Sequence, residues 1–324
     1  MSTIGTPSSR IAFGPVPSRR LGRSLGINHV QPKACSYSCC YCQVGRTPRL
    51  RAQRDTFYSP AEVVARVRER VASLVAAGEE VDYLTFVPDG EPTLDVHLGE
   101  EIRALRSLGI PIAVITNGSL LSRPDVRDEL CEADWVSVKV DTGHEAIWRG
   151  VNRPHGRLRW RDLVEGMHAF ASAYRGVLVT ETMLLGGLND RESEVHDTAE
   201  LVGSLSPAIA YLAVPTRPPA EPWARAAGDE AVVRAYEVFR AWQPKVELML
   251  EEPDDAFVAV GDIRADLLAI TAVHPMREAA VRRLLQRVGA TWTVVTELTA
   301  GGHLAEVRYG PNRYFVRPVG RSDA

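Results

Sequence analysis

Long uninterrupted apolar runs are missing from this 324-residue chain. A membrane-spanning helix needs about 18 or more such residues in a row, so we expect no transmembrane segment and no membrane partner. Residues 1–10 lack an apolar core behind a basic start, so we expect no secretory signal and a cytoplasmic protein. An excess of one charge is missing too. The formal net charge of −3 argues against a general polyanion binder, although a local basic patch stays open.

Lysine is scarce, and the remaining basic residues are arginines. Lysine occurs only at Lys33, Lys139 and Lys245, among 38 Lys and Arg in total. A lysine that acts as a general base, or that forms a Schiff base, therefore has only three candidates.

Cysteine is also scarce, but its distribution is informative. Four of the five cysteines fall within residues 35–42, and Cys131 stands alone. An odd, clustered set in a chain without a predicted secretion signal argues against a disulfide framework. It favours a metal or cluster site in a reducing compartment, and we expect Cys131 to be a small buried hydrophobic residue.

The central part of the chain alternates short apolar segments with amphipathic ones. We expect strands over residues 25–30, 82–87, 111–116, 135–140, 176–183 and 208–214. We expect helices over residues 60–77, 97–108, 124–131, 161–173, 192–204 and 229–242. This alternation predicts an α/β fold of parallel βα units. Six units are too few for an eight-stranded barrel of about 250 residues. A partial (β/α)6 TIM-like barrel fits, with an open doubly wound sheet as the structural alternative.

Four parts follow from this pattern: an N-terminal arm, residues 1–24; the partial barrel, 25–245; a linker, 246–262; and a small C-terminal α+β domain, 263–319. The first part of the chain, to about residue 54, reads as loop apart from one short strand. The C-terminal domain has helical segments at 264–273, 277–288 and 292–298, then a hairpin around residues 310–312. Three helices followed by a β-hairpin is the order of a winged helix.

The clustered cysteines have a spacing that suits an iron–sulfur cluster. Cys35, Cys39 and Cys42 form C-x3-C-x2-C. Three thiolates on one tight loop can hold three irons of a [4Fe–4S] cluster, whose usual complement is four protein thiolates. The fourth iron would then be open to a small molecule. A zinc site completed by His29 and a redox pair of Cys39 with Cys42 are the alternatives. Cys40 could replace Cys39 as a ligand, but the resulting C-x4-C-x-C spacing fits poorly, so we expect Cys40 not to be a ligand.

The motif C-x3-C-x-aromatic-C at the start of a βα series resembles the radical S-adenosylmethionine (SAM) superfamily. In that superfamily a Gly-Gly-Glu-Pro-like segment after the second strand binds the methionine amino group. Here the segment PDGEPTL, residues 88–94, keeps Gly90, Glu91 and Pro92 but has Asp89 in place of the first glycine. The resemblance implies that Glu91 binds the ammonium and that Gly90 permits close backbone approach. It also implies that Tyr41 lies beside the adenine.

Polar residues also mark the ends of the later predicted strands. In parallel βα barrels the ligand groups sit at the carboxyl ends of strands. The candidates for binding the SAM carboxylate and ribose are Asn117, Lys139, Asp141, Glu181 and Val214. Lys139 is in addition a candidate catalytic residue that binds a carboxylate or forms an imine. The alternative for Lys139 is a salt bridge within the barrel, for example to Glu181.

Residues 14–28 and 274–285 resemble a narrower group, the uncharacterised iron–sulfur oxidoreductases related to the wyosine-forming tRNA enzyme. The wyosine enzymes hold a second cluster through further cysteines. Here only Cys40 and Cys131 remain, so a second three-cysteine cluster is not available.

The resemblance implies an oxidoreductase with a [4Fe–4S] cluster and SAM as cofactors. An electron from a donor such as flavodoxin or ferredoxin would cleave SAM to a 5′-deoxyadenosyl radical, which abstracts hydrogen from a substrate. Arginines near the cysteines and in the C-terminal domain suit phosphates, which favours an RNA base or another phosphate-bearing substrate. These arginines are Arg19, Arg20, Arg23, Arg46, Arg49, Arg51, Arg54, Arg282, Arg283 and Arg287.

Two other functions stay open. One is modification of a peptide or partner protein that the C-terminal domain recognises. The other, from a different class, is an iron–sulfur redox-sensing regulator that binds nucleic acid. A sensor needs no SAM site, so the Glu91 segment discriminates between a sensor and an enzyme.

Overall fold

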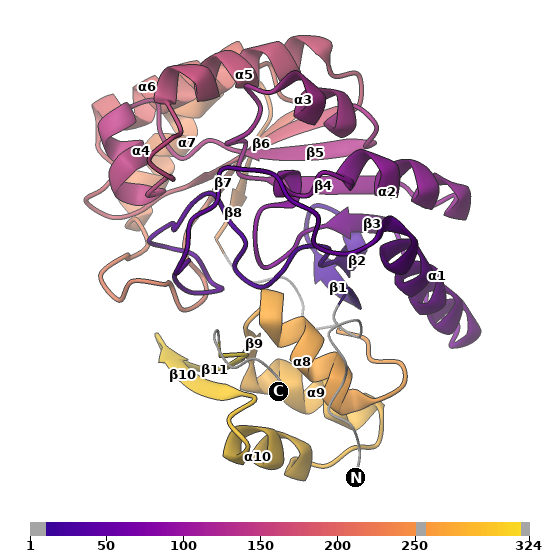
Figure 1. Cartoon of the computed structure of the whole chain (residues 1–324). Coiled ribbons are helices and arrows are strands. Elements are labelled where there is room, and N and C mark those ends of the chain that lie inside the picture. The colour runs from indigo at the N-terminus through magenta and orange to yellow at the C-terminus, as the bar shows by residue number, and fades with distance from the viewer. Residues whose placement is uncertain (1–10, 251–256, 319–324) are drawn as a thin grey trace.

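The structure is a computed structural model that describes residues 11–250 and 257–318. Its larger lobe is an eight-stranded sheet with helices on its outer side, and its smaller lobe holds three helices and three short strands (Figure 1). No helix within the described ranges is long and apolar enough to cross a membrane.

The six predicted strands are present and run parallel, each paired with the next in chain order. They are β2 (Gly22–Ile27), β3 (Tyr83–Phe86), β4 (Ile112–Thr116), β5 (Trp135–Lys139), β6 (Val177–Met183) and β7 (Ile209–Ala213). This arrangement confirms an α/β fold of the partial-barrel type. The described part of the sheet is open, with different strands at its two edges.

The two edge strands were not predicted. β1 (Ala12–Ser18) pairs antiparallel with β2, and β8 (Val246–Met249) pairs parallel with β7. The expectation of loop before β2 is therefore wrong for β1, whose Pro15 and Pro17 obscured the strand pattern. Proline is tolerated in an edge strand because its missing N–H breaks no ladder bond on the open side. The sheet thus takes strands from the segments assigned to the arm and the linker.

Helices connect the strands much as the pattern predicted. They are α1 (Pro60–Ala76), α2 (Leu98–Leu105), α3 (Pro124–Leu130), α5 (Trp160–Ala173), α6 (Glu192–Ser204) and α7 (Asp229–Trp242). A further short helix, α4 (Glu145–Val151), was not predicted. At the start of α1, Ser59 accepts a hydrogen bond from the Glu62 N–H and Pro60 occupies the first helical position. Both features are strong helix-start signals, which explains why this boundary was readable from sequence.

The smaller lobe follows the barrel. It contains α8 (Ile263–Val273), β9 (Met276–Arg277), α9 (Glu278–Arg287), α10 (Thr293–Ala300), β10 (Ala305–Tyr309) and β11 (Asn312–Val316). The predicted helices and hairpin are present, and β9 adds a third antiparallel strand beside β11. The winged-helix assignment stays a prediction.

The smaller lobe has its own apolar core, and that core includes Phe13 from β1 of the large lobe. Arg70 of α1 reaches across to the small lobe. It donates to the main-chain oxygen of Gly14 and forms an ion pair of 2.9 Å with the largely buried Asp266 of α8. The two lobes are therefore joined by shared apolar packing and by a buried charge pair.

Candidate active site

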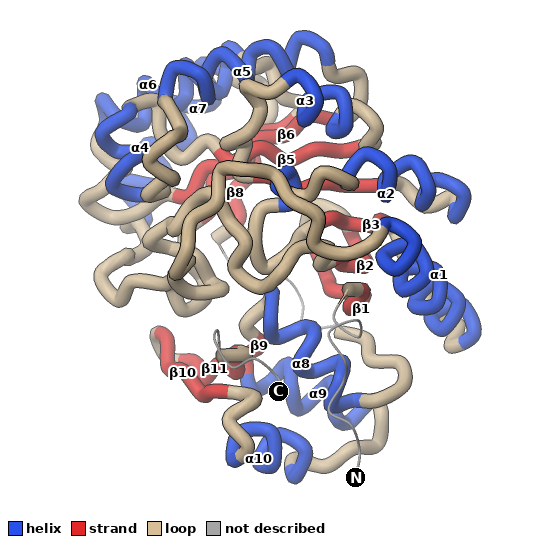
Figure 2. The backbone as a smooth tube through the Cα atoms, in the orientation of Figure 1, coloured by secondary structure: helices blue, strands red, loops and turns tan. Residues whose placement is uncertain are grey.

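The carboxyl ends of the parallel strands open onto one cavity of about 420 Å³. Long loops gather around this end of the sheet, in front of the strands in Figure 2. All predicted site residues line the cavity except Pro92 and Asp141, which lie behind its wall. Those that line it are Cys35, Cys39, Cys42, Tyr41, Gly90, Glu91, Asn117, Lys139, Glu181 and Val214.

Each of the three cysteine sulfurs has a side-chain N–H donor from a different part of the chain. Asn117 Nδ2 lies 3.7 Å from Cys35 Sγ, and Asn152 Nδ2 lies 3.5 Å from Cys39 Sγ. Lys33 Nζ lies 3.5 Å from Cys42 Sγ and also donates to the main-chain oxygen of Gly45 at 2.7 Å. Hydrogen bonds to ligating sulfurs orient them and tune the metal centre, so this donor set fits a cluster held by three thiolates.

The thiols of Cys35 and Cys39 are protonated when nothing binds them. Burial raises the pKa of Cys35 to about 12, with the Glu91 carboxylate as the next cause. Burial and then Asp141 raise the pKa of Cys39 further. Because metal ligation deprotonates thiols, binding of a cluster would release these protons.

The remaining cysteines lie elsewhere. Cys40 is fully buried, packs with Val151, Leu185 and Ala224, and does not line the cavity. Cys131 is exposed at the end of α3, so the expectation that it is buried is wrong. The helix ends at the surface, which the local apolar pattern did not reveal.

The Glu91 segment is packed directly on the cysteine loop. The Glu91 N–H donates to the Ala34 carbonyl at 2.8 Å, and Lys33 N–H donates to the Asp89 carbonyl at 3.2 Å. A Cβ on Gly90 would lie only 2.2 Å from the Ala34 oxygen. Gly90 is therefore required by the contact between the two loops, where the sequence suggested only an approach to ligand. Pro92 begins the short helix η2 (Pro92–Leu94) behind the cavity wall.

The Glu91 carboxylate is buried and held by several donors. Its Oε1 accepts bonds of 2.6 Å from the hydroxyls of Thr93 and Thr116, and Oε2 accepts from the Asn117 N–H at 2.8 Å. Burial raises the pKa of Glu91, and these hydrogen bonds oppose that rise. The oxygen Oε2 accepts only one of these bonds and keeps acceptor capacity, which suits a bound ammonium group.

Asp141 organises the wall behind Tyr41. The Tyr41 hydroxyl and Asn152 Nδ2 both donate to Asp141 Oδ2, the latter at 2.6 Å. Asp141 Oδ1 accepts from the Met183 N–H at 2.9 Å. The carboxylate predicted to contact cofactor is thus used to position Tyr41 and Asn152, and it does not face the cavity itself.

Lys139 forms the salt bridge that the sequence offered as an alternative. Its Nζ lies 2.8 Å from Glu181 Oε1, while Arg20 pairs with the other oxygen of the same carboxylate. Burial alone would raise the pKa of Glu181, but Lys139 and Arg20 lower it to about 2. Burial opposes the charge on Lys139, yet Asp141 and Glu181 raise its pKa overall. Imine formation needs a neutral amine, so this environment disfavours it.

The smaller lobe also lines the cavity, which the sequence did not predict. Val273 and His274, at the end of α8, face the same space as the cysteines. Gln43 from the cysteine loop donates to the Val273 oxygen at 3.0 Å, and Tyr314 donates to the Thr216 oxygen at 2.9 Å. Burial lowers the pKa of His274 well below its usual value, and Arg217 lowers it further. Nothing in the local sequence indicates that residues so distant along the chain meet at one site.

His29 is not part of the cavity wall. It is fully buried and lies 2.6 Å from Glu101 through its Nδ1 atom. The structure therefore does not bring His29 together with the three cysteines, as the alternative zinc site would require.

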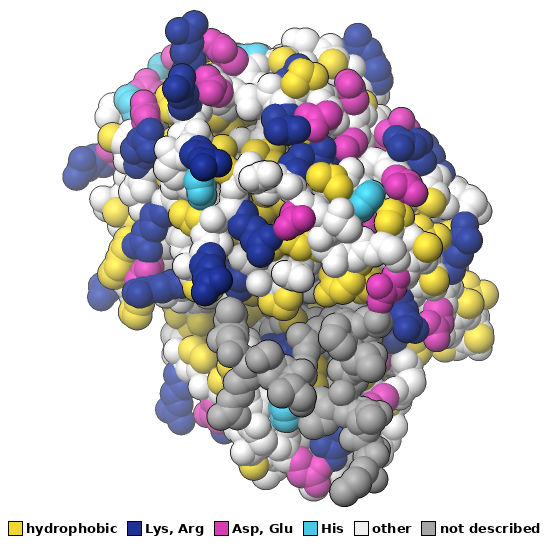
Figure 3. Space-filling model, viewed as in Figure 1, with side chains coloured by type: hydrophobic (Ala, Val, Ile, Leu, Met, Phe, Trp, Pro, Cys, Tyr) yellow, Lys and Arg dark blue, Asp and Glu magenta, His cyan; other side chains and the backbone are white. Residues whose placement is uncertain are grey.

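Most of the arginines expected to form a basic rim have acidic partners. Arg23 pairs with Glu80 and Asp82, and Arg54 is buried between Asp125 and Glu129. The other pairs are Arg20–Glu181, Arg46–Glu221, Arg51–Asp55, Arg282–Glu278 and Arg287–Glu79. On the face in Figure 3, Lys and Arg are scattered with Asp and Glu among them. These arginines are thus paired with the protein's own acidic side chains.

The chain belongs to the radical SAM superfamily, since residues 32–202 match that family. It is 42% identical to the UPF0026 protein of Methanocaldococcus jannaschii, over 97% of this chain and 98% of that protein. Members of the superfamily use a [4Fe–4S] cluster and SAM, so this chain is an enzyme of that chemistry whose substrate is unknown.

Solved structures share the fold. A radical SAM methyltransferase from Sphaerobacter thermophilus gives a TM-score of 0.53 at 17% identity, covering 70% of this chain and 66% of that one. The structure of TYW1 with a lysine–pyruvate adduct gives a TM-score of 0.53 at 13% identity, covering 73% and 78%. At such identities the likeness concerns the fold alone.

Proposed function

We propose that the enzyme reductively cleaves SAM and abstracts hydrogen from a substrate in this cavity. The substrate is a small anionic molecule, or a single group of a larger molecule that enters the cavity. The observation that carries this is one cavity lined by the three cysteines, by Glu91 and by residues of both lobes. Cys35, Cys39 and Cys42 would hold the cluster, and Glu91 would bind the SAM ammonium. The chemistry supplied there when both are bound is one-electron cleavage of the sulfonium to a hydrogen-abstracting radical.

The chain's own groups orient the reactants and exclude water. Lys33, Asn117 and Asn152 direct N–H donors at the three ligand sulfurs. Tyr41, fixed by Asp141, offers an aromatic wall for the adenine. Exclusion of water protects a reactive radical from side reactions, and residues of the smaller lobe cover part of the cavity.

The proposed substrate class follows from the cavity lining. Basic residues outnumber acidic ones among the residues that line the cavity. The basic residues are Arg19, Arg20, Arg217, Lys33 and Lys139, and the acidic ones are Asp89, Glu91 and Glu181. This balance suits a phosphate or carboxylate group. A cavity of about 420 Å³ that also receives SAM is too small for a folded nucleic acid. An RNA base would enter only as a single flipped-out nucleotide.

The electron donor and the compartment are part of the proposal. A low-potential flavodoxin or ferredoxin would reduce the cluster, and a thiol-ligated cluster without disulfides suits the cytoplasm. The peptide-modifying and redox-sensor alternatives predict different behaviour. A sensor has no use for the buried, hydrogen-bonded Glu91 that faces the cavity.

The first experiment is anaerobic. The protein is reconstituted with iron and sulfide, reduced with dithionite and given SAM, and 5′-deoxyadenosine is assayed by mass spectrometry. Wild type and the exposed-cysteine control Cys131→Ala should both form the nucleoside, whereas Cys39→Ala should not. Glu91→Gln should retain the cluster but bind SAM about 10- to 100-fold more weakly, a loss of about 1.4–2.8 kcal/mol.

The outcome decides between the classes. Nucleoside formation in Cys39→Ala equal to wild type would contradict the proposed cluster ligand. A wild-type cluster whose spectrum SAM does not perturb would sink the catalytic proposal and favour the sensor. Stimulation of SAM cleavage by small phosphate-bearing metabolites, by purified RNA or by peptides then separates the substrate classes.

A further inference from the structure

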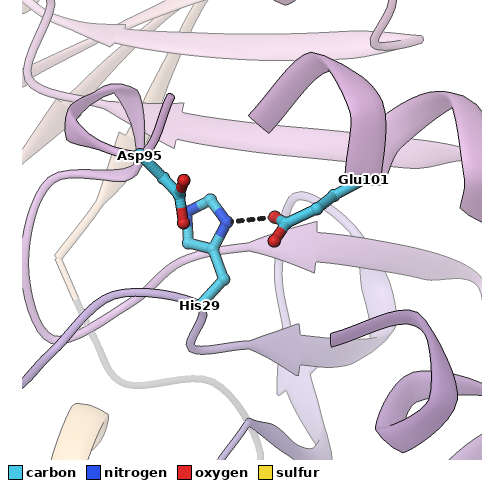
Figure 4. A group of neighbouring side chains, drawn as sticks. All are labelled: His29, Asp95 and Glu101. Atoms are coloured by element: carbon cyan, nitrogen blue, oxygen red, sulfur yellow. Dashed lines mark hydrogen bonds and ion pairs between the residues drawn. The ribbon is translucent and has the colours of Figure 1, made fainter. Parts of the chain in front are cut away.

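A second group of ligand-type side chains lies outside the cavity, behind the Glu91 segment. His29 follows β2, Asp95 follows η2, and Glu101 lies in the first turns of α2. Figure 4 shows the imidazole between the two carboxylates, with a hydrogen bond to Glu101. All three residues have 0% exposed surface.

Each of the three residues keeps a buried polar atom that has no hydrogen-bond partner. These atoms are Nε2 of His29, Oδ2 of Asp95 and Oε1 of Glu101. Buried polar atoms are nearly always satisfied, so three orphans on three neighbouring residues require an explanation. One orphan carboxylate oxygen is commonplace, whereas an imidazole and two carboxylates together are a metal-ligand set.

Charge leads to the same conclusion. Two ionised carboxylates beside a neutral imidazole would carry two negative charges, and buried charge is costly unless a cation compensates it. Arg54 donates to the Asp95 main-chain oxygen, but it is already paired with Asp125 and Glu129. Burial lowers the pKa of His29, but Glu101 and Asp95 raise it overall, which favours a competing arrangement with an imidazolium between the carboxylates. With both carboxylates ionised, that arrangement still leaves one net negative charge and the same three atoms without partners.

We propose that His29, Asp95 and Glu101 bind one divalent transition-metal ion. Each residue offers one ligand atom, and these atoms lie within 4.8 Å of one another. Two ligands held at about 2.1 Å from one ion lie at most about 4.2 Å apart, so binding requires the three side chains to draw together and the His29–Glu101 hydrogen bond to give way to the ion. Imidazole together with carboxylates suits zinc, iron(II) or manganese.

The placement gives the ion a structural role at the catalytic cavity. Asp95 is four residues after Glu91, and His29 is four residues before Lys33. An ion bound here would link three segments: the Glu91 segment, the chain just before the cysteine loop, and α2. The ion is separate from the cluster, and its presence does not depend on the proposed SAM cleavage.

Elemental analysis of the cluster-loaded protein tests this directly. Protein expressed with zinc, iron and manganese supplied is exchanged into chelator-free buffer and measured by mass spectrometry for metals and for acid-labile sulfide. Cluster iron is taken as equal in amount to the acid-labile sulfide. We expect about one further metal ion per chain beyond that cluster iron. His29→Gln and Glu101→Gln should lose at least tenfold of this extra metal with unchanged iron-to-sulfide content.

The chain provides a matched control in His196, Asp197 and Glu200, a similar group that is largely exposed. Glu200→Gln should leave the metal content unchanged. X-ray absorption of the extra ion should show nitrogen and oxygen ligands without sulfur, which excludes zinc bound to an empty cysteine loop. Less than a tenth of an equivalent of extra metal in wild type would overturn the proposal, as would sulfur ligation or equal metal in His29→Gln. The histidine would then be an ion-paired imidazolium.

Discussion

Single side chains from distant positions organise the cysteine loop. The loop supplies three sulfurs and one of their donors, Lys33, while Asn117 and Asn152 come from later segments. Lys33 is buried in spite of its charge and adopts a left-handed backbone conformation with φ of 59°. Such a conformation is uncommon for a residue other than glycine and clusters at functional sites. The ammonium is thereby held beside Cys42.

Replacement of Lys33 by methionine should lower the midpoint potential of the cluster. Reduction adds negative charge, which a cation near Cys42 stabilises, so its loss should shift the potential down on the order of 50 mV. Potentiometric titration followed by electron paramagnetic resonance measures this shift. Lys245→Met is the control, because Lys245 is largely exposed and lies 3.7 Å from Glu247. An unchanged potential in Lys33→Met with full cluster content would contradict this role.

His274 should make the protein less stable in acid. Burial and Arg217 lower its pKa below the value of about 6.5 in the unfolded chain. Below that pH the unfolded state therefore binds a proton that the folded state does not, and stability falls as pH falls. The slope from this one group is at most about 1.4 kcal/mol per pH unit.

Urea unfolding of wild type and His274→Gln between pH 7 and pH 5 tests this. The wild type should lose more free energy of unfolding than the variant over that interval. Parallel pH dependences for the two proteins would show that His274 does not carry this effect.

At the scale of elements, the Glu91 segment and the cysteine loop are in close main-chain contact. Its main-chain bonds run between Glu91 and Ala34 and between Lys33 and Asp89. Hydrogen bonds between main chains fix two loops more firmly than side-chain contacts, because no rotamer change can release them. The relative position of cluster ligands and Glu91 is therefore built into the backbone.

Gly90→Ala should separate these two loops. The added Cβ would meet the Ala34 carbonyl oxygen at 2.2 Å, a distance that forces the backbone to move. We expect reduced cluster incorporation and loss of SAM binding, measured by iron content and by isothermal titration. Gly156→Ala is the matched control, because a Cβ there meets nothing within 4 Å. Wild-type SAM affinity in Gly90→Ala would contradict the tight packing of the loops.

For the molecule as a whole, the closure of the cavity depends on the attachment of the smaller lobe. Attachment uses the apolar packing of Phe13 into the lobe and the pair of Arg70 with Asp266. Near the cavity, the hydroxyls of Tyr309 and Tyr314 donate to the oxygens of Pro215 and Thr216. The lobe is thus held both behind the sheet edge and at the cavity mouth.

Arg70→Ala should loosen the smaller lobe. The change leaves the buried Asp266 without its cation, and breaking such a pair costs about 3–5 kcal/mol. Hydrogen exchange should become faster in α8, and His274 should gain exposure to solvent. Arg66→Ala on the same helix is the control, because its pair with Glu69 is exposed. Equal exchange in the two variants would show that Arg70 does not anchor the lobe.

How much was readable from sequence depended on whether the signal was local. The cysteine spacing, the Gly90–Pro92 segment and the start of α1 at Ser59 are short patterns with a direct physical meaning. The helix begins as predicted, and the three cysteines, Gly90 and Glu91 line the cavity, whereas Pro92 does not. Strand ends predicted Asn117, Lys139, Glu181 and Val214 at the cavity, because parallel strands share one edge. The same rule placed Asp141 there, but its carboxylate turned back to Tyr41 and Asn152.

The sequence by itself determined the superfamily, the parallel βα architecture and the cysteines that face the cavity. These depend on periodicity and on residues close together along the chain. Only the tertiary structure decided which arginines are neutralised by acids, that β1 and β8 extend the sheet, and that His274 reaches the cavity. It also brought His29, Asp95 and Glu101 together. Each of these depends on contacts between segments far apart in sequence, whose pairing is set by packing of the whole chain and leaves no local pattern.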